Sequence, residues 1–296
     1  MSGEMHIFRC PACRASLDES GMGSGFACGA CGAAVQVFEG VPALVRDADA
    51  VARQIREAKA SGRAMWYEES QLTQWEGPYR HHVLKRKKYV ESVLARHLAG
   101  RSGAAVGLDM GCGDGANFFW LAQHVGVLYG SDYNIERLAR AAKRPGPRMV
   151  FMADCTDYPA NDDSFDAVYF NHVLEHIPDD AAVLCEVRRI LKPGGVCVLG
   201  VPNEGAWFWR LAYKLQPELL RTSDHVHFYT AETIAEKCRA AGFQINEIKH
   251  IGWGVPHWAL DSKIRGVKVV DDALELFGRT LLKSQATSLY LILTRA

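Results

Sequence analysis

Apolar and polar residues repeat with two different spacings through residues 101–296. Short runs of mostly apolar residues have the character of buried parallel strands, and between them apolar residues recur at helical spacing. This pattern predicts an α/β fold in which helices cover both faces of a Rossmann-like sheet. Strands are expected at 106–109, 128–132, 149–154, 165–170, 196–201, 243–251 and 288–294. Helices are expected at 116–123, 134–143, 178–191 and 231–241, with Thr230 as the N-cap of the last.

A glycine-rich turn follows the first strand. Gly111, Gly113 and Gly115 let the backbone turn sharply and approach a ligand, and the helix start behind the turn favours polar or anionic groups. Such glycines also suit a tight turn that binds nothing. Because Gly111-x-Gly113-x-x-Ala116 fits the dinucleotide fingerprint too, the glycines alone do not separate a nicotinamide cofactor from S-adenosylmethionine (SAM).

Two acidic residues favour SAM. Asp109 stands two residues before the first glycine, where a carboxylate can hold an ammonium group of the ligand through bridging contacts. Asp132 ends the second strand, 23 residues after Asp109. An acid at about this spacing accepts hydrogen bonds from ribose hydroxyls.

Two further motifs follow in order. Residues 165–177 read Phe-Asp-Ala-Val-Tyr-Phe-Asn-His-Val-Leu-Glu-His-Ile, and residues 189–195 read Arg-Ile-Leu-Lys-Pro-Gly-Gly. With the glycine-rich turn and the two acids, residues 80–250 resemble the class I SAM-dependent methyltransferases, in particular the group that acts on small molecules. The resemblance implies the seven-stranded methyltransferase fold, with the last strand antiparallel.

The same resemblance implies which residues contact SAM. It places around the cofactor the glycine loop and the residues that follow the second, third and fourth strands, namely Asp109, Gly111, Cys112, Gly113, Gly115, Asp132, Tyr133, Asp154, Cys155, Asn171 and His172. Asp154 also suits a helix cap or a solvated loop acid. Glu175 and His176 look paired for a metal, but in the related enzymes this segment starts a helix packed near the adenosine.

Four cysteines near the N-terminus form two Cys-x-x-Cys pairs. Fourteen residues separate Cys10 and Cys13 from Cys28 and Cys31. Two such knuckles facing each other give a tetrahedral sulfur site for Zn²⁺, and the metal supplies folding energy that so short a segment lacks. The alternative is a redox dithiol, but that motif does not occur in duplicate. We predict a zinc-ribbon domain at residues 1–46 with a structural Zn²⁺, and it resembles the ribbons that accompany several methyltransferases.

Composition limits the other functions. The chain has 34 Lys and Arg against 34 Asp and Glu, so no net charge attracts nucleic acid or an anionic membrane. Neither a signal peptide nor a membrane-spanning apolar run is seen, which predicts a cytoplasmic protein whose nine cysteines are free or metal-bound. The basic run at 85–88 is interpreted as solvated surface, with an RNA-base methyltransferase as the alternative.

Residues 47–100 are expected to form a helical linker and a lid over the cofactor. Tyr67, Tyr79 or Arg80 could contact the methionine carboxylate, although the aromatic residues here also suit pinning the segment to the main domain. An apolar helical face is expected within residues 83–98, made of Val83, Leu84, Val90, Val93, Leu94 and Leu98.

Two insertions, at 203–229 and 254–286, carry aromatic residues expected to line the acceptor site. If the acceptor must lose a proton, His172, His225 and His227 are the candidate bases, while His225 and His227 equally suit a structural pair. A helix expected at 269–282 could form a homodimer interface. We predict SAM-dependent methyl transfer to a small organic acceptor. A different SAM-using reaction on the same fold is the further alternative.

Overall fold

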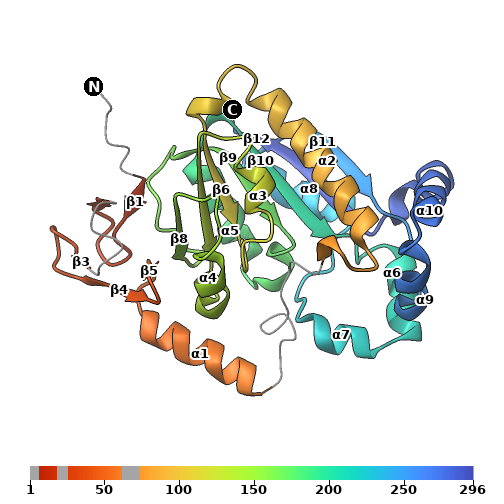
Figure 1. Cartoon of the computed structure of the whole chain (residues 1–296), viewed down its shortest axis with the longest axis horizontal. Helices are drawn as coiled ribbons and strands as arrows, with labels where there is room; N and C mark the ends of the chain where they lie inside the picture. Colours follow the sequence, from red (N-terminus) through yellow and green to blue (C-terminus); the bar gives the residue numbers. More distant parts are fainter. Residues whose placement is uncertain (1–6, 19–25, 62–73, 296) are drawn as a thin grey trace.

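The computed structural model describes residues 7–18, 26–61 and 74–295. In this part of the chain one sheet has the strand order β11-β12-β10-β9-β6-β7-β8-β5-β4-β3 (Figure 1). The seven strands expected from the sequence make up most of it: β6 (Val106–Met110), β7 (Val127–Asp132), β8 (Met149–Met152), β9 (Phe165–Asn171), β10 (Leu191–Pro202), β11 (Gln244–Ile251) and β12 (Ser288–Thr294). Strands β6 to β10 run parallel, and β12 runs antiparallel between β10 and β11. The predicted Rossmann-like fold is confirmed.

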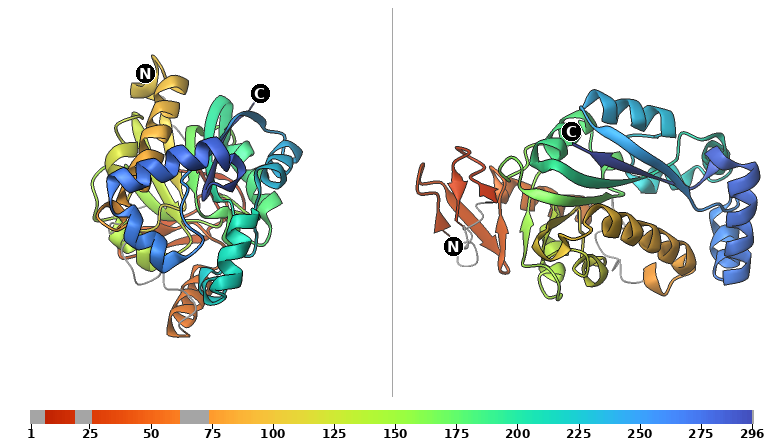
Figure 2. Two further views of the ribbon diagram at one scale, coloured as in Figure 1. Left: turned by 90° about the vertical axis from the view of Figure 1, so that its right-hand side faces the viewer. Right: turned by 90° about the horizontal axis from the view of Figure 1, so that it is seen from above.

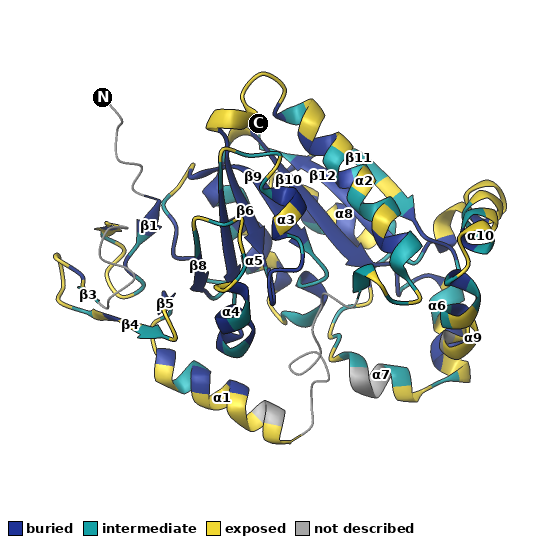
Figure 3. Ribbon diagram, viewed as in Figure 1, coloured by how far each residue is buried: buried dark blue, intermediate teal, exposed yellow. Residues whose placement is uncertain are grey.

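Helices cover both faces of the sheet. One layer contains α5 (Asp180–Ile190) and α8 (Ala231–Ala240), and the other contains α2 (Arg80–His97), α3 (Phe118–Leu121) and α4 (Ile135–Ala141). Successive side chains of a strand point to opposite faces. In β10, Cys197 and Leu199 join the core under the first layer, whereas Val196 and Val198 join the core under the second. The strands are therefore buried on both sides (Figure 3).

The position of β6 decides where a ligand can bind. β6 lies between β7 and β9, so the chain builds the sheet outward in one direction and then resumes on the other side. Open α/β sheets bind ligands at such a switch point, outside the carboxyl ends of the strands. The glycine-rich turn after β6 and the segment after β9 therefore border the same crevice.

Local details both confirm and correct the sequence prediction. Thr230 caps α8 as expected, because its Oγ1 accepts from the N–H of Thr233 at 3.3 Å and the Thr233 hydroxyl accepts from the N–H of Thr230 at 2.9 Å. Leu84 is 41% exposed and does not belong to the apolar face of α2. The face that packs on the sheet contains Val90, Val93 and Leu94, since these lie three to four residues apart.

The cysteine-rich segment is fused to the edge of the sheet. Its strands are β1 (Phe8–Arg9), β2 (Ser16–Leu17), β3 (Phe26–Ala27), β4 (Ala34–Phe38) and β5 (Val41–Ala43). β5 pairs in parallel with β8 through Ala43 and Met152. The ring of Phe8 is fully buried and packs edge-on against Tyr129 and Phe151, at 5.5 and 4.9 Å between centroids. The segment thus shares a hydrophobic core with the main sheet.

Both insertions lie at the end of the molecule opposite the cysteine-rich segment (Figures 1 and 2). The first contains α6 (Trp207–Leu215) and α7 (Glu218–Ser223), and the second contains α9 (Trp258–Arg265) and α10 (Lys268–Leu281). Helix α10 leaves apolar side chains in solvent, among them Val269, Leu276, Phe277 and Leu281. The homodimer stays a prediction. No helix in the described ranges is long and apolar enough to cross a bilayer.

The linker is described in two parts. Helix α1 (Ala48–Ala60) confirms the expected connecting helix. Tyr67 lies outside the described residues. Arg80 donates to the carbonyl oxygen of Gly266 at 2.7 Å, which ties the start of α2 to the second insertion.

Gly200 in β10 should not tolerate a side chain. A Cβ atom there would lie 2.2 Å from Oδ1 of Asn171 and 2.9 Å from Cε1 of Tyr290. We expect Gly200→Ala to destabilise the fold by about 1–3 kcal/mol, because overpacking forces both neighbours to move. Chemical denaturation measures the change. Gly266→Ala is the control, since its nearest heavy atom would be 3.7 Å away. Equal midpoints for the two variants would contradict the packing argument.

Candidate active site

A cavity of about 840 Å³ opens at the carboxyl ends of β6, β7 and β9. Eight of the eleven residues expected to contact SAM line it, namely Asp109, Gly111, Asp132, Tyr133, Asp154, Cys155, Asn171 and His172. Cys112, Gly113 and Gly115 do not line this cavity. They belong to the turn that shapes its floor.

The glycine-rich turn is held by the end of β7. The N–H groups of Gly111 and Cys112 both donate to the carbonyl oxygen of Ser131, at 2.7 and 2.8 Å. Gly111 adopts φ +76°, and a Cβ atom there would lie 2.2 Å from Cγ2 of Val173. Only glycine suits this position, because the conformation and the close approach both exclude a side chain.

Asp132 is oriented by the same turn. Its Oδ2 accepts from the N–H of Gly113 at 2.8 Å, and its Oδ1 accepts from the N–H of Asn134 at 2.8 Å. Each carboxylate oxygen has a further lone pair. The side chain can therefore hold ribose hydroxyls without releasing the turn.

A positive ligand group would stabilise Asp109 in its ionised form. Its side chain is buried, and no donor within the described ranges makes a hydrogen bond to its Oδ2 atom. Burial and the nearby charge of Asp132 raise the pKa of Asp109 well above its ordinary value. Since an unpaired buried carboxylate is costly, a cationic group in the cavity would stabilise it. The ammonium group of SAM fits this demand.

Asp154 has a local structural role as well as a place on the cavity wall. Its Oδ1 accepts from both the N–H and the hydroxyl of Thr156, at 2.8 and 2.7 Å. This contact is the local loop role that the sequence also allows for this acid. The side chain borders the cavity as well, so its contact with the cofactor stays a prediction.

A second cavity of about 550 Å³ adjoins the first. Its exposed lining surface is mainly apolar and comes from residues of the insertions and α2, including Val83, Phe208, Trp209, Ala212, Tyr213, Leu219 and Val255. Polar side chains, among them Glu204, Asp261 and Arg265, also border it. Five residues with polar side chains line both cavities: Gln74, Arg86, His172, Ser223 and His225. We call this shared wall the junction. It lies between a polar cavity and a largely apolar one.

Arg86 reaches the junction, although the sequence had indicated solvated surface. Its Nη1 lies 3.0 Å from Nε2 of His172. Because a guanidinium stays protonated, it donates to that nitrogen, and the imidazole proton is then on Nδ1. Nδ1 faces Oε1 of Glu175 at 3.4 Å. Arg86 cannot be singled out from the sequence, because it stands in a run with three lysines. Only the fold shows that its side chain borders the two cavities.

Ion pairs neutralise two of the three lysines of the basic run. Lys85 contacts the carboxylates of Asp271 and Asp272, at 2.5 and 3.0 Å. Lys87 contacts Glu91 at 2.7 Å. This run therefore does not present a uniform basic surface to nucleic acid.

The three candidate bases are not equivalent. His225 lines the junction, and its Nδ1 lies 2.6 Å from Oε2 of buried Glu204. His227 lines neither cavity, since its Nε2 lies 3.0 and 3.2 Å from the carbonyl oxygens of Ile177 and Pro178. The structural alternative therefore suits His227. The junction brings together only His172 and His225 of the three.

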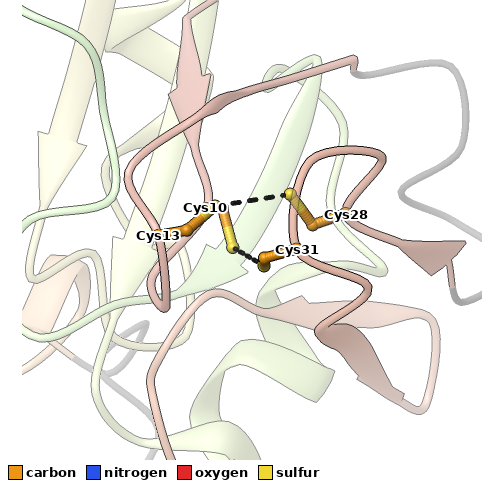
Figure 4. Close-up of side chains that lie close together, drawn as sticks. All are labelled: Cys10, Cys13, Cys28 and Cys31. Atoms are coloured by element: carbon orange, nitrogen blue, oxygen red, sulfur yellow. Dashed lines mark hydrogen bonds between the residues drawn. The ribbon is translucent and has the colours of Figure 1, made fainter.

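The four N-terminal cysteines converge on one point (Figure 4). The Sγ atoms of Cys10 and Cys31 are 3.8 Å apart, and those of Cys13 and Cys28 are 3.7 Å apart. All four sulfurs lie within 4.8 Å of one another. The two knuckles have matching backbone geometry, because Arg14 and Gly32, each just after a second cysteine, both have positive φ, +67° and +74°.

Comparison with known proteins agrees with the cavity. Residues 108–199 match the family model described as a methyltransferase domain. The chain carries a class I SAM-dependent methyltransferase domain. The matched residues include the glycine-rich turn, Asp132 and the junction residue His172.

Individual relatives resemble the methyltransferase domain over part of their length. The ubiquinone/menaquinone biosynthesis C-methyltransferase UbiE of Desulfotalea psychrophila is 29% identical over 167 residues, which cover 49% of this chain and 68% of the relative. The sterol 24-C-methyltransferase erg6 of Aspergillus fumigatus is 40% identical over 114 residues, covering 36% of this chain and 30% of the relative. The chain thus spans from about a third to two thirds of these relatives' length.

A solved structure shares the fold. The SAM-dependent methyltransferase from Mesorhizobium loti superimposes with a TM-score of 0.50 at 21% identity, over 69% of this chain and 96% of that one. At this identity the likeness shows the fold alone.

Replacing Asp132 should weaken SAM binding. Each hydrogen bond to a charged group contributes about 1.5–3 kcal/mol, so we expect Asp132→Ala to lose at least tenfold in affinity by calorimetry. Asp132→Asn should lose less, because one oxygen can still accept. Asp162→Asn is the control, since that acid is 70% exposed and pairs with Arg189. Wild-type affinity in Asp132→Ala would remove this residue from the site.

Proposed function

We propose that the protein transfers a methyl group from SAM to a small organic acceptor with a mainly apolar body. The observation that carries the proposal is the pair of adjoining cavities, one lined by residues expected to bind SAM and one whose exposed surface is mainly apolar. The relatives with small-molecule names support the same acceptor class.

The residues of the cofactor cavity bind and orient. Asp109 supplies a carboxylate for the ammonium group and Asp132 for the ribose, which directs the remaining part of the ligand towards the junction. SAM bound there supplies the methyl group on a cationic sulfur. Alignment of two reactants can contribute an effective molarity of about 10⁵ M or more, so positioning is the main catalytic effect that this geometry offers.

The acceptor cavity excludes water and holds the reacting atom. Phe208, Trp209 and Tyr213 of α6 form an apolar wall. Polar side chains such as Glu204 and Asp261 also border this cavity, and water exclusion would strengthen electrostatic contacts inside the site. At the junction, the guanidinium of Arg86 can donate to an acceptor oxygen while it holds His172. The role of His172 or His225 as a base stays a prediction.

The geometry favours a small molecule over RNA. Ion pairs neutralise Lys85 and Lys87, and RNA bases are recognised by exposed aromatic and basic grooves. The apolar cavity has room for one acceptor of moderate size, because small-molecule sites usually enclose about 300–1,000 Å³.

A methyl-labelling experiment tests the proposal. Purified protein with SAM carrying a radioactive methyl group is incubated with the low-mass fraction of a cell extract, with total RNA, or with protein. We expect label in the low-mass fraction, concentrated in its apolar part, and much less label with Asp132→Ala when SAM is below saturation. Label in RNA instead would establish the RNA-base alternative. SAM binding without any methyl transfer would favour a different reaction on this fold.

We further propose that the four cysteines hold one structural Zn²⁺. For a Zn–S bond of about 2.3 Å, the sulfur–sulfur edge of a tetrahedron is about 3.8 Å. The edges of 3.8 and 3.7 Å in this segment support that geometry. Four thiolates leave no open coordination position, so the ion would stabilise the fold of the segment and the packing of Phe8 on the main sheet.

The zinc proposal predicts a cysteine-specific loss of metal. Cys28→Ser should contain one Zn²⁺ per chain fewer than the wild type by elemental analysis, and its melting temperature should fall. Cys185→Ser is the matched control, because Cys185 is an exposed free thiol away from the cluster. Equal zinc in both variants would overturn the assignment.

A further inference from the structure

We infer that Glu175, His176 and His225 form a second metal site next to the junction, which binds a divalent transition-metal ion. One donor atom from each residue lies within 4.8 Å of the other two. Glu175 and His176 belong to a 3-10 turn (Leu174–His176) after β9, and His225 follows α7. The site therefore joins the sheet to the first insertion.

Glu175 is the strongest sign of a missing cation. Its side chain is fully buried, and apart from Nδ1 of His172, which lies 3.4 Å from Oε1, neither carboxylate oxygen has a side-chain donor nearby among the described residues. A carboxylate buried with so few donors is stabilised by a positive partner that offsets its desolvation.

His225 is held as a metal-binding histidine usually is. Its Nδ1 lies 2.6 Å from Oε2 of Glu204, and the hydroxyl of Tyr213 donates to the other oxygen of Glu204. A ligating imidazole normally donates its second N–H to such a carboxylate, which fixes the ring and strengthens the ligand. Nε2 of His225 is then the nitrogen left to bind the ion.

The two histidines stand next to each other. The rings of His176 and His225 are 4.7 Å apart between centroids and meet at 74°. Two imidazoles and one carboxylate suit Mn²⁺, Fe²⁺, Co²⁺, Ni²⁺ or Zn²⁺ better than Ca²⁺ or Mg²⁺.

The charges around His225 also permit a metal-free arrangement. Burial lowers the pKa of His225, but the hydrogen bond and charge of Glu204, with Glu175 and Asp224, raise it overall. A protonated His225 would then neutralise the buried acids without an ion. The two arrangements differ in one measurable property, the number of metal ions bound next to the junction.

The location gives the ion a function that rests on the proposed methyl transfer. His176 lines the cofactor cavity and His225 lines both cavities. Three protein ligands leave coordination positions open for a further oxygen. The ion would bind a hydroxyl or carbonyl oxygen of the acceptor and, as a Lewis acid, lower the pKa of a hydroxyl. Acceptors with such an oxygen are therefore the expected substrate class.

Manganese binding to the full chain, with its cysteine site loaded with zinc, tests the inference. Thiolates bind Mn²⁺ weakly, so the four cysteines should not take it up. The decrease in the paramagnetic resonance signal of free Mn²⁺ gives the number of ions bound per chain. We expect one Mn²⁺ per chain in the wild type. Glu175→Gln and His225→Ala should weaken binding at least tenfold. Glu204→Gln should weaken it roughly 10–100-fold, because that carboxylate only positions a ligand.

A second measurement counts bound Zn²⁺, in case the site binds zinc in preference to manganese. After incubation with excess Zn²⁺ and gel filtration, the wild type should retain one Zn²⁺ per chain more than Glu175→Gln. Glu247→Gln, an acid paired with Arg96 on the surface, is the matched control and should behave as the wild type. SAM calorimetry shows which variants are folded.

The overturning result is specific. If the wild type binds no Mn²⁺ and retains no more zinc than Glu175→Gln, the metal site is wrong and protonated His225 neutralises the acids. That result leaves the methyl-labelling experiment unaffected, so failure of the metal site and failure of the proposed methyl transfer are distinguishable.

Discussion

Burial of carboxylates at the carboxyl edge of the sheet is the constraint on which this active site depends. Asp109, Glu175 and Glu204 are all buried there. A charged group removed from water must be compensated by a cation or by hydrogen bonds. Glu204 is compensated within the protein by Tyr213 and His225, whereas Asp109 has an oxygen without a described donor. The site is therefore most stable when a positively charged ligand occupies it.

The sheet explains why these acids come together. Parallel strands that leave a switch point end at the same edge, and the loops after β6, β7 and β9 all border one crevice. Buried apolar strands fix that edge rigidly, because their side chains are packed on both faces. The insertions can then vary over a fixed cofactor site, which is how one fold accommodates many acceptors.

The cysteine-rich segment covers the edge of the sheet that β8 would otherwise form. β5 pairs with β8, and β4 and β3 continue the sheet beyond it. An uncovered β8 would expose unpaired backbone groups, which favours aggregation. The salt bridge of Arg9 with Glu186, at 3.2 Å, further joins this segment to α5. The cysteine-rich segment lies far from the insertions, at the other end of the sheet, which fits a role in stabilising the fold rather than in binding the acceptor.

The sequence by itself determined the order of the strands, the glycine-rich turn, Asp109, Asp132 and the cysteine pairs, because these depend on short spacings and local backbone demands. Only the tertiary structure decided the parts of the junction. Glu204 meets His225 across 21 positions, and Arg86 meets His172 across 86. No local pattern encodes such contacts, since they arise when packed elements bring distant side chains together. The same physics separates His227, two residues from His225, from both cavities.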